Sequence, residues 1–228
     1  MVKSKQLVLP RVDKQGKSYI SYSQINVWKK SKREYIRQYF LGESGPAALK
    51  PYGDFGTKIG EALENNDFSE FTEKEQEFLK TVTRYDEFER EISLKMDGFY
   101  VKGYIDSNTL SYETKNKKKV QVVNKILDYK TGEISKRRAD YESDDYIQIP
   151  IYAAAIKQDT GCLPKECSVV LIQRDGNAFA GEELTLGDEY VTIKKKVTTK
   201  VVDDVLKYVQ ETAEEISMLY ELFLKLNK

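Results

Sequence analysis

An α/β fold is predicted for this chain of 228 residues, with a β region between helices. Residues 87–96 alternate apolar and polar side chains, which is the pattern of a half-buried strand. Residues 199–226 place apolar side chains at the period of about 3.6 residues that marks an amphipathic helix. Apolar residues make up 40% of the chain and charged residues 32%, as in an ordinary soluble globular protein.

The amino-terminal part of the chain is expected to be helical. The hydroxyl of Ser21 or Ser23 can cap a helix that runs to about Leu41, because an N-cap oxygen accepts from a backbone N–H of the first turn. The segments expected after it are a loop at residues 42–53 and helices at residues 56–65 and 72–85. Residues 1–18 are expected to form an arm, and residues 19–228 a single domain.

The central β region is expected to hold strand 87–96 and the strands that follow it. Asp97 and Gly98 are typical of the tight turn of a β-hairpin. Residues 111–119 are polar and rich in lysine, so a connection is expected there. The further expected elements are strands at residues 100–109, 120–129, 169–173 and 190–194. A helix is expected to begin at Asp144 or Asp145 and to run to about Asp159.

Composition limits the chemistry that the chain can carry out. It contains no histidine, which excludes Ser-His-Asp and Cys-His catalysis and zinc sites with histidine ligands. Its two cysteines are too few for a disulfide framework or a four-thiolate metal site. Acid–base chemistry must therefore use Asp, Glu, Lys, Tyr or metal-bound water, and carboxylate-held Mg²⁺ or Mn²⁺ is the natural cofactor. The 37 basic residues balance the 37 acidic ones, which argues against a uniformly basic surface.

The apolar segments of the chain are short. None approaches the ~20 residues that cross a bilayer. The amino-terminal residues lack the long apolar core of a signal peptide. We therefore expect a cytoplasmic protein with no membrane partner.

The strand that ends near Gly132 carries the most specific chemical signal. Asp128 and Lys130 lie two residues apart in it, so their side chains point to the same face. A carboxylate that can hold a divalent cation, beside an ammonium that can hold a water or a phosphate oxygen, is the minimum equipment for metal-assisted phosphodiester hydrolysis. Taken alone, an exposed ion pair is the usual explanation for such a pair.

Three further residues extend this signal. Asp106 can meet Asp128 on one cation if their strands are antiparallel neighbours. Two nearby buried acids need a metal or a basic partner such as Lys130, because an unpaired buried carboxylate is costly. Gln148 and Tyr152 lie one helical turn apart, where they can orient Lys130 or touch a phosphate. Taken alone, an ordinary helix face is the simpler explanation for Gln148 and Tyr152.

Together these residues resemble the PD-(D/E)XK nuclease superfamily, in particular its RecB-like branch. That branch combines a G-x-x-x-H-E-x-x-E helix, a G-x-x-D strand, a D-x-K-T-G strand end and a Q-x-x-x-Y helix. The matching residues, in the same order, are Gly56, Glu61, Glu64, Gly103, Asp106, Asp128, Lys130, Thr131, Gly132, Gln148 and Tyr152. The resemblance covers residues 20–160. It implies a restriction-endonuclease-like core in which helices flank a central mixed β-sheet, to which the long carboxy-terminal amphipathic helix is added.

The resemblance also implies a metal-dependent DNA nuclease, with an exonuclease as the favoured form, that acts in DNA processing, recombination or repair. The implied catalytic residues are Asp106, Asp128, Lys130, Gln148 and Tyr152. The implied ligands for Mg²⁺ or Mn²⁺ are Asp106, Asp128, the backbone carbonyl of Tyr129, and Glu61. Lys130 would position the attacking water. The basic residues expected to bind DNA phosphates are Lys136, Arg137 and Arg138.

The chain departs from the family pattern in two places. Gly60 stands where many relatives have a metal-binding histidine, so Glu61, Glu64 or water would take its place. Ser31 stands near the position of one of four cysteines that hold an iron–sulfur cluster in many relatives. The two cysteines present cannot hold a cluster by themselves, so we expect none.

Two other classes of function compete with the nuclease. A catalytically inactive nuclease-fold subunit that binds DNA or acts as a scaffold is the main alternative, and Gly60 is its sequence support. A structural protein with a plain Asp–Lys salt bridge fits the ordered motifs least well. The expected nucleic-acid partner is DNA, as single strands or duplex ends. A recombination or helicase partner, and a phage origin with action in the host-cell cytoplasm, rest on analogy with the fold alone.

Overall fold

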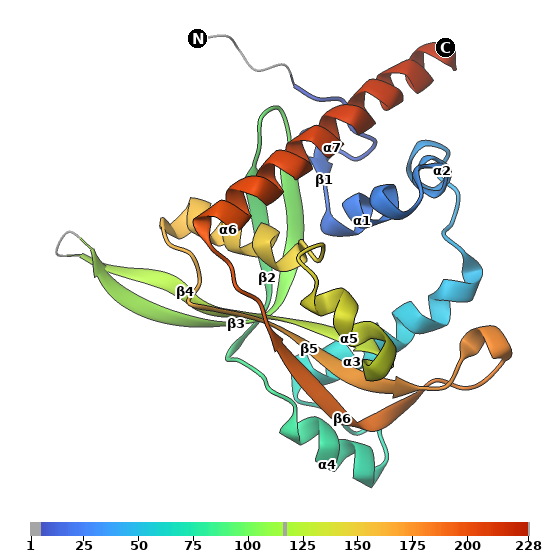
Figure 1. Ribbon diagram of the computed structural model, residues 1–228, viewed down its shortest axis with the longest axis vertical. Helices are drawn as coiled ribbons and strands as arrows, with labels where there is room; N and C mark the ends of the chain where they lie inside the picture. The colour runs from blue at the N-terminus through green and yellow to red at the C-terminus, as the bar shows by residue number, and fades with distance from the viewer. Residues whose placement is uncertain (1–5, 116–117, 228) are drawn as a thin grey trace.

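The computed structural model describes residues 6–115 and 118–227, and it confirms the predicted α/β class (Figure 1). The strands are β1 (Tyr19–Ile20), β2 (Glu87–Lys95), β3 (Tyr100–Lys115), β4 (Lys118–Gly132), β5 (Glu166–Asp175) and β6 (Thr185–Lys194). Within the described residues they form a six-stranded sheet of order β1-β3-β4-β5-β6, with β2 paired to β3. The pairs β1–β3 and β4–β5 are parallel and the others antiparallel, so the sheet is mixed, as the resemblance implies.

Helices cover both faces of this sheet. They are α1 (Tyr22–Lys30), α2 (Lys32–Tyr35), the π-helix η1 (Ile36–Phe40), the 3-10 helix η2 (Ala47–Leu49), α3 (Lys50–Asn65), α4 (Glu73–Thr81), α5 (Ile134–Glu142), α6 (Gln148–Thr160), the 3-10 helix η3 (Ala178–Ala180) and α7 (Thr199–Leu226). Figure 1 shows α6 and the long α7 above the sheet and α4 below it. None of these described helices combines the length and apolarity that crossing a bilayer requires.

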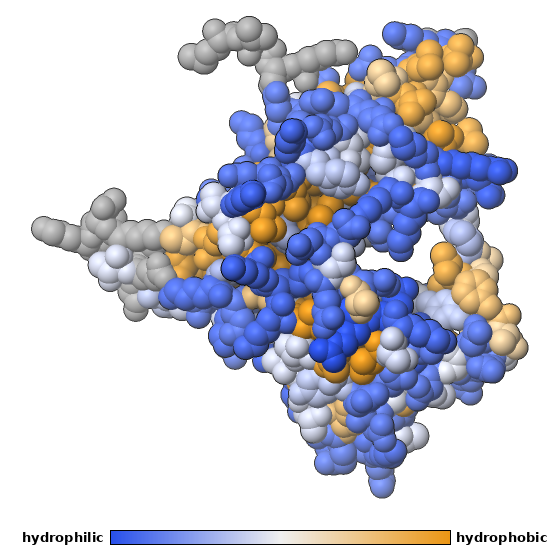
Figure 2. All heavy atoms as spheres, in the orientation of Figure 1, coloured by the Kyte–Doolittle hydropathy of each residue, from blue (hydrophilic) through white to orange (hydrophobic). Residues whose placement is uncertain are grey.

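Two apolar clusters form the core, one on each face of the sheet. The α6-side core joins α1, α6 and α7 to the sheet and includes Trp28 and Ile149. The α3-side core joins α3 and α4 to the other face and includes Leu63 and Leu79. Beyond the core, apolar side chains gather at the end of α7, where Leu226 is exposed (Figure 2). The sheet is thus a shared layer between two packed halves.

The first predicted helix is interrupted, which corrects the expectation of one helix up to Leu41. Ser31 adopts an extended conformation with φ −159°, and its hydroxyl accepts from the backbone N–H of Glu34. Because a serine side chain can satisfy the free N–H groups of a new helix, the chain restarts there as α2. A π-helical turn follows at η1.

The polar connection predicted at residues 111–119 is also wrong over its described part. β3 and β4 continue their pairing through Tyr112 and Gln121 and on to Lys115 and Lys118. The expectation equated polarity with a loop, but strand pairing uses backbone groups and tolerates polar side chains on an exposed ribbon. The sequence also failed to predict α5, which is short and mostly polar.

One edge of β3 changes partner partway along its length. β2 pairs with one edge from Tyr100 to Asn108. On the other edge, β1 pairs with residues 100–101 and β4 begins at Ser107. Between them, residues 102–106 have no strand partner on this edge among the described residues, and we call this interval the β3 gap. Asp106 lies at the end of the β3 gap, next to the start of β4 pairing.

The amino-terminal segment, residues 6–18, packs against the α6-side core. Leu9 is buried there. The backbone N–H of Leu7 donates to the carbonyl of Gly98 at 3.0 Å. The backbone N–H of Val8 donates to Ser217 Oγ on α7, also at 3.0 Å. The described part of the expected arm therefore lies along the domain.

Candidate active site

Asp128 lies at the centre of the predicted site. Its side chain has no exposed surface, and Lys130 Nζ lies 2.5 Å from its Oδ2. The hydroxyl of Tyr146 donates to the same oxygen at 2.7 Å. The other oxygen, Oδ1, is buried with no hydrogen-bond partner among the described residues. A buried carboxylate with one unsatisfied oxygen is costly, so this position favours a bound cation.

Asp106 meets Asp128 across the β3–β4 junction. The strands are antiparallel, and the register that pairs Ser107 with Leu127 places the two acids next in line. Asp106 Oδ2 accepts from the backbone N–H of Tyr129 at 2.7 Å. Burial and the charge of Asp128 raise the pKa of Asp106 to about 7, although Lys130 opposes the shift. The structure therefore brings the two acids together, as the predicted metal site requires.

Lys130 supplies the positive charge of this group. Burial alone would lower the pKa of its ammonium, but the nearby carboxylates of Asp128 and Asp106 raise it above the ordinary value. Its Nζ also donates to the backbone carbonyl of Tyr129 at 3.2 Å. Lys130 thus stays cationic at neutral pH and lies close to both acids.

Gln148 and Tyr152 reach the site through a residue that the sequence did not single out. Gln148 Nε2 donates to the Tyr152 hydroxyl at 2.6 Å, and the Tyr146 hydroxyl lies 2.8 Å from Gln148 Oε1. The phenol of Tyr146 has one proton and cannot donate it to both Asp128 and Gln148. If Tyr146 donates to Asp128, the side-chain amide of Gln148 must be turned so that its NH₂ group donates to the Tyr146 oxygen. Among the described contacts, neither Gln148 nor Tyr152 bonds to Lys130. Their link is to Asp128.

An open cleft of about 570 Å³ lies between α3 and the strands that carry Asp106 and Lys130, and the buried Asp128 does not line it. Glu61 and Glu64 line it from α3, and Asp106 and Lys130 line it from the sheet. A Cβ atom at Gly60 would meet nothing within 4 Å, so this position also faces open space. Glu61 therefore shares the cleft with the predicted ligands, on its opposite wall.

Glu89 is a second residue of this cleft that the sequence did not identify. The register of β2 and β3 places it opposite Asp106, and it is the one position from Glu87 to Lys95 left out of that pairing. Its φ of 45° is unusual for a residue with a side chain. Partial desolvation and the charge of Glu64 raise its pKa. Neither the backbone angle nor the register is visible in the alternating pattern of this strand.

Tyr146 carried a weak sequence signal. It precedes Gln148 by two residues, just before α6 begins. Nothing in that spacing shows that a phenol will reach a strand eighteen positions away, because the contact depends on the loop after α5.

The basic residues predicted to hold phosphates lie on α5 and are paired within it. Lys136 lies 2.6 Å from Glu133, Arg137 lies 3.1 Å from Asp140, and Arg138 lies 2.6 Å from Glu142. These neighbours offset the positive charge that the run suggested. Phosphate binding by these three residues stays a prediction.

The acidic groups near the cleft fit a hard divalent cation in their chemistry. Carboxylate and carbonyl oxygens are the ligands that Mg²⁺ and Mn²⁺ prefer. The unsatisfied Oδ1 of Asp128 and the raised pKa of Asp106 both mark positions where a cation would relieve an unfavourable charge. In the part of the chain that the structure describes, no three acidic or cysteine side chains stand close enough to hold a metal as they are. Side chains such as Glu61 would therefore have to move inward.

Comparisons with known proteins identify the family and a similar fold. A family model described as the PD-(D/E)XK nuclease superfamily matches residues 66–221. No curated protein matches the sequence. Among solved structures, one described as a "putative exonuclease" from Eubacterium rectale is similar in fold, with a TM-score of 0.52 and 14% identity over 92% of this chain and 87% of that chain. The family match includes Asp106, Asp128, Lys130, Gln148 and Tyr152, and it begins after α3.

Proposed function

The chain belongs to the PD-(D/E)XK nuclease superfamily, and from that membership we propose that it is a metal-dependent deoxyribonuclease of the RecB-like branch that degrades DNA from its ends. The observation that carries this proposal is the buried Asp128, with one oxygen bound by Lys130 and Tyr146 and the other without a partner. The similarity in fold to a structure described as an exonuclease supports exonuclease action as the favoured mode.

Asp106, Asp128 and the carbonyl of Tyr129 would hold Mg²⁺ or Mn²⁺. Glu61 and Glu89 are the acids in the cleft that would complete the ligand set in place of a histidine at position 60. When bound, the metal lowers the pKa of a coordinated water and offsets charge on the reacting phosphate.

The other proposed roles, which are to hold the attacking water and to fix the metal ligands in place, belong to side chains of this protein. The ammonium of Lys130, cationic at neutral pH, would hold the attacking water or a phosphate oxygen. Tyr146 would keep the Asp128 carboxylate in place, with Gln148 and Tyr152 behind it. Asp106 would have to lose its proton to act as a ligand, and its pKa of about 7 makes this loss easier above neutral pH.

Cleavage of end-labelled linear DNA and of a closed circle, in Mn²⁺, Mg²⁺ or EDTA, tests the proposal. We expect loss of the linear substrates with metal only, and survival of the circle. Asp128→Ala and Lys130→Ala should each lower the rate by about 100-fold or more, because each removes a group that acts on the transition state. Lys125→Ala is a matched control on the same strand, where Lys125 pairs with Glu166 at 3.3 Å outside the cleft. Cutting of the circle would keep the site but make the enzyme an endonuclease.

Gly60 offers a gain-of-function test of the same site. A side chain fits at this position, and a histidine there would add the ligand found in many relatives. We expect Gly60→His to lower the Mn²⁺ concentration needed for half-maximal thermal stabilisation, because a site with one more ligand binds its metal more tightly. Gly60→Ala controls for the gain in helix propensity, about 1 kcal/mol, that any residue other than glycine brings.

The inactive-subunit alternative predicts a different set of results. A parent protein that is inert on every substrate, retains DNA in a gel shift and shows no stabilisation by Mn²⁺ would favour it. Gain of metal binding in Gly60→His alone would then identify the missing ligand as the cause.

A further inference from the structure

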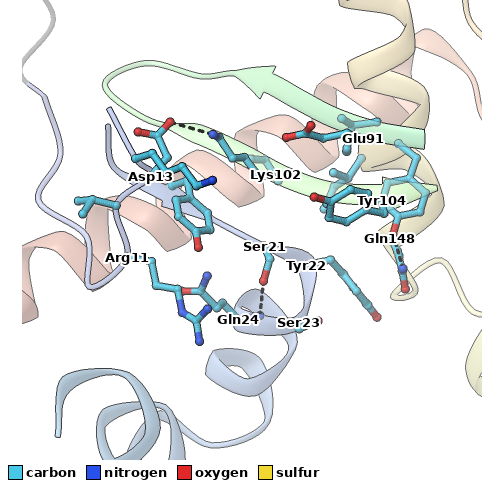
Figure 3. A pocket seen from close by; sticks show the side chains of 18 of the residues that line it. Arg11, Asp13, Ser21, Tyr22, Ser23, Gln24, Glu91, Lys102, Tyr104 and Gln148 are labelled. Atoms are coloured by element: carbon cyan, nitrogen blue, oxygen red, sulfur yellow. Dashed lines mark hydrogen bonds and ion pairs between the residues drawn. The ribbon is translucent and has the colours of Figure 1, made fainter. Parts of the chain in front are cut away.

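A second hollow, the β3 groove, lies on the other side of Gln148 and Tyr152 from Asp128. Its volume is about 840 Å³. Figure 3 shows Lys102 and Tyr104 of the β3 gap along one wall and Ser21 and Gln24, at the start of α1, along the opposite wall. The amino-terminal segment, with Arg11 and Lys14, closes one end, and the beginning of α6 closes the other.

The β3 groove is lined by residues that belong to the hydrogen-bond network of the predicted catalytic acid, Asp128. Gln148 lines the groove, and one hydroxyl, that of Tyr146, separates its side chain from Asp128. Tyr22 also lines the groove and packs edge-to-face on Tyr146, with ring centroids 5.8 Å apart. Burial and the charge of Asp128 raise the pKa of Tyr22, so its hydroxyl keeps its proton at neutral pH. A chain that fills the groove would therefore contact Gln148, which is linked to Asp128 through the Tyr146 hydroxyl.

The groove walls carry an aromatic surface and unneutralised positive charge. Tyr104 is 53% exposed, so its ring is open to solvent. Arg11 and Lys14 form no ion pair with any residue that the structure describes, although Arg11 lies over the Tyr39 ring. Lys102 is neutralised by Asp13 at 2.8 Å. Exposed aromatic rings and unpaired cations that line one groove are the combination that binds the bases and phosphates of unpaired nucleic-acid strands.

We propose that the β3 groove binds single-stranded DNA, with a base stacked on Tyr104 and phosphates held by Arg11 and Lys14. This inference rests on the proposed nuclease function and names the form of DNA that enters the site. A volume of about 840 Å³ lies in the range of ~300–1,000 Å³ that holds one small molecule. A hollow of this volume takes a few nucleotides of one strand.

Glu91 is the groove residue that opposes this binding. It lines the same hollow, is exposed, and forms no ion pair among the described residues. Its charge repels phosphates, which limits affinity. Glu91→Gln is therefore expected to bind single strands more tightly than the parent.

Fluorescence anisotropy of a labelled oligothymidylate in EDTA tests the groove without cleavage. We expect Tyr104→Ala to weaken binding roughly tenfold, as removal of one stacking ring does, and Tyr104→Phe to keep most of the affinity. Arg11→Ala and Lys14→Ala should each reduce the slope of log affinity against log salt by about 0.7. Tyr112→Ala is the matched control, because Tyr112 is on the same strand, is 60% exposed and lies outside the groove.

Two results would overturn the inference. One is equal binding of the oligothymidylate by the parent, Tyr104→Ala and Arg11→Ala, with each variant melting as the parent does. The other is an affinity for a blunt duplex that equals the affinity for the single strand and that falls by the same factor in the groove variants.

The assay separates this inference from the proposed function. If the groove variants bind the oligothymidylate as the parent does but the parent cleaves DNA with metal, the nuclease proposal is kept and the groove proposal is rejected. Groove-dependent binding by a protein that cleaves nothing would keep the groove and remove the nuclease.

Discussion

Asp106 shows how the site trades stability for function at the scale of one residue. In the metal-free protein its pKa is raised from 3.8 to about 7, so the folded state retains a proton that the unfolded chain has lost. The stabilising effect of that proton is fully present below the unfolded pKa and is lost as pH rises through the folded pKa. The proposed metal binding at neutral pH therefore requires a charge on Asp106 that the fold disfavours.

We expect Asp106→Asn to make the metal-free protein more stable than the parent, by a margin that grows as pH rises from 3.8 to about 7. Asparagine keeps an oxygen to accept from Tyr129 but never acquires the charge. Thermal unfolding in EDTA across this pH range measures the margin, with Asp97→Asn in an exposed turn as control. Addition of Mn²⁺ should reverse the order, stabilising the parent and not the variant. A margin independent of pH would contradict the assignment.

Tyr146 is expected to act on metal binding through Asp128. Loss of its hydroxyl in Tyr146→Phe removes one of the two donors to Oδ2. Partners behind metal ligands typically contribute about 10–100-fold to metal affinity or activity, so a rise of that size in the Mn²⁺ needed for half-maximal cleavage is expected. Tyr141→Phe is the control, because its ring packs on Tyr146 but its hydroxyl accepts from Arg137. Equal Mn²⁺ requirements in the two variants would rule out this role.

The sequence predicted the residues of the site whose relation is local and failed for those whose relation is not. Asp128 and Lys130 share a face because they are two residues apart on one strand, and Asp106 needed only an antiparallel neighbour. Tyr146 and Glu89 required knowledge of a loop path and of a strand register. Contacts of that kind depend on the folded structure and leave no spacing rule in the chain.

At the scale of the element, β2 contains the backbone distortion that accompanies the site. Regular pairing with β3 stops at Glu89 and resumes at Arg90. A positive φ at a residue with a Cβ atom costs of order 1–2 kcal/mol, which the rest of the strand pairing must offset. The distortion occurs opposite Asp106, where an undistorted ladder would bring two carboxylates side by side.

Replacement of Glu89 by glycine is expected to raise the free energy of unfolding of the metal-free protein by about 1 kcal/mol, because glycine adopts positive φ without strain. The same substitution at Glu87, an exposed position of the paired strand, should lower it, because glycine weakens a regular strand. Chemical denaturation of the two variants measures the contrast. A reduced Mn²⁺-induced shift in Glu89→Gly would add evidence for its place among the ligands. Destabilisation by both substitutions would exclude stored strain.

The predictability of the elements follows from the strength of their patterns. α7 and β2 have clear apolar periods and were predicted nearly to their ends. α5 has few apolar residues, and its carboxyl end is held by Lys195, which donates to the carbonyls of Tyr141, Glu142 and Ser143. A lysine that closes a helix more than fifty positions earlier gives no local signal, so that helix was not predicted.

At the scale of the whole molecule, the two cores share one sheet and should unfold together. Trp28, the one tryptophan of the chain, is buried in the α6-side core, so its fluorescence reports on that half. Leu79 is fully buried in the α3-side core. If the chain is a single cooperative domain, a substitution in one half should therefore also shift the unfolding transition measured in the other half.

We expect Leu79→Ala to lower the free energy of unfolding by about 2–5 kcal/mol, the usual cost of such a cavity. Its Trp28 fluorescence and far-ultraviolet circular dichroism transitions should shift together. Leu226→Ala, at an exposed position near the end of α7, should leave both unchanged. A Trp28 transition that stays in place while the dichroism transition splits would show two units in the predicted domain of residues 19–228.

The bond between Val8 and Ser217 joins positions 209 residues apart, and it bears on the order of events during translation. The amino-terminal segment leaves the ribosome first, yet its partners on β3 and α7 are made much later. Contacts between distant positions form slowly because the intervening chain must first be ordered. The wall of the β3 groove that carries Arg11 and Lys14 would therefore reach its folded position only after α7 has emerged from the ribosome. A nascent chain from which β3 and β4 have emerged but α7 has not would therefore lack this wall of the proposed groove.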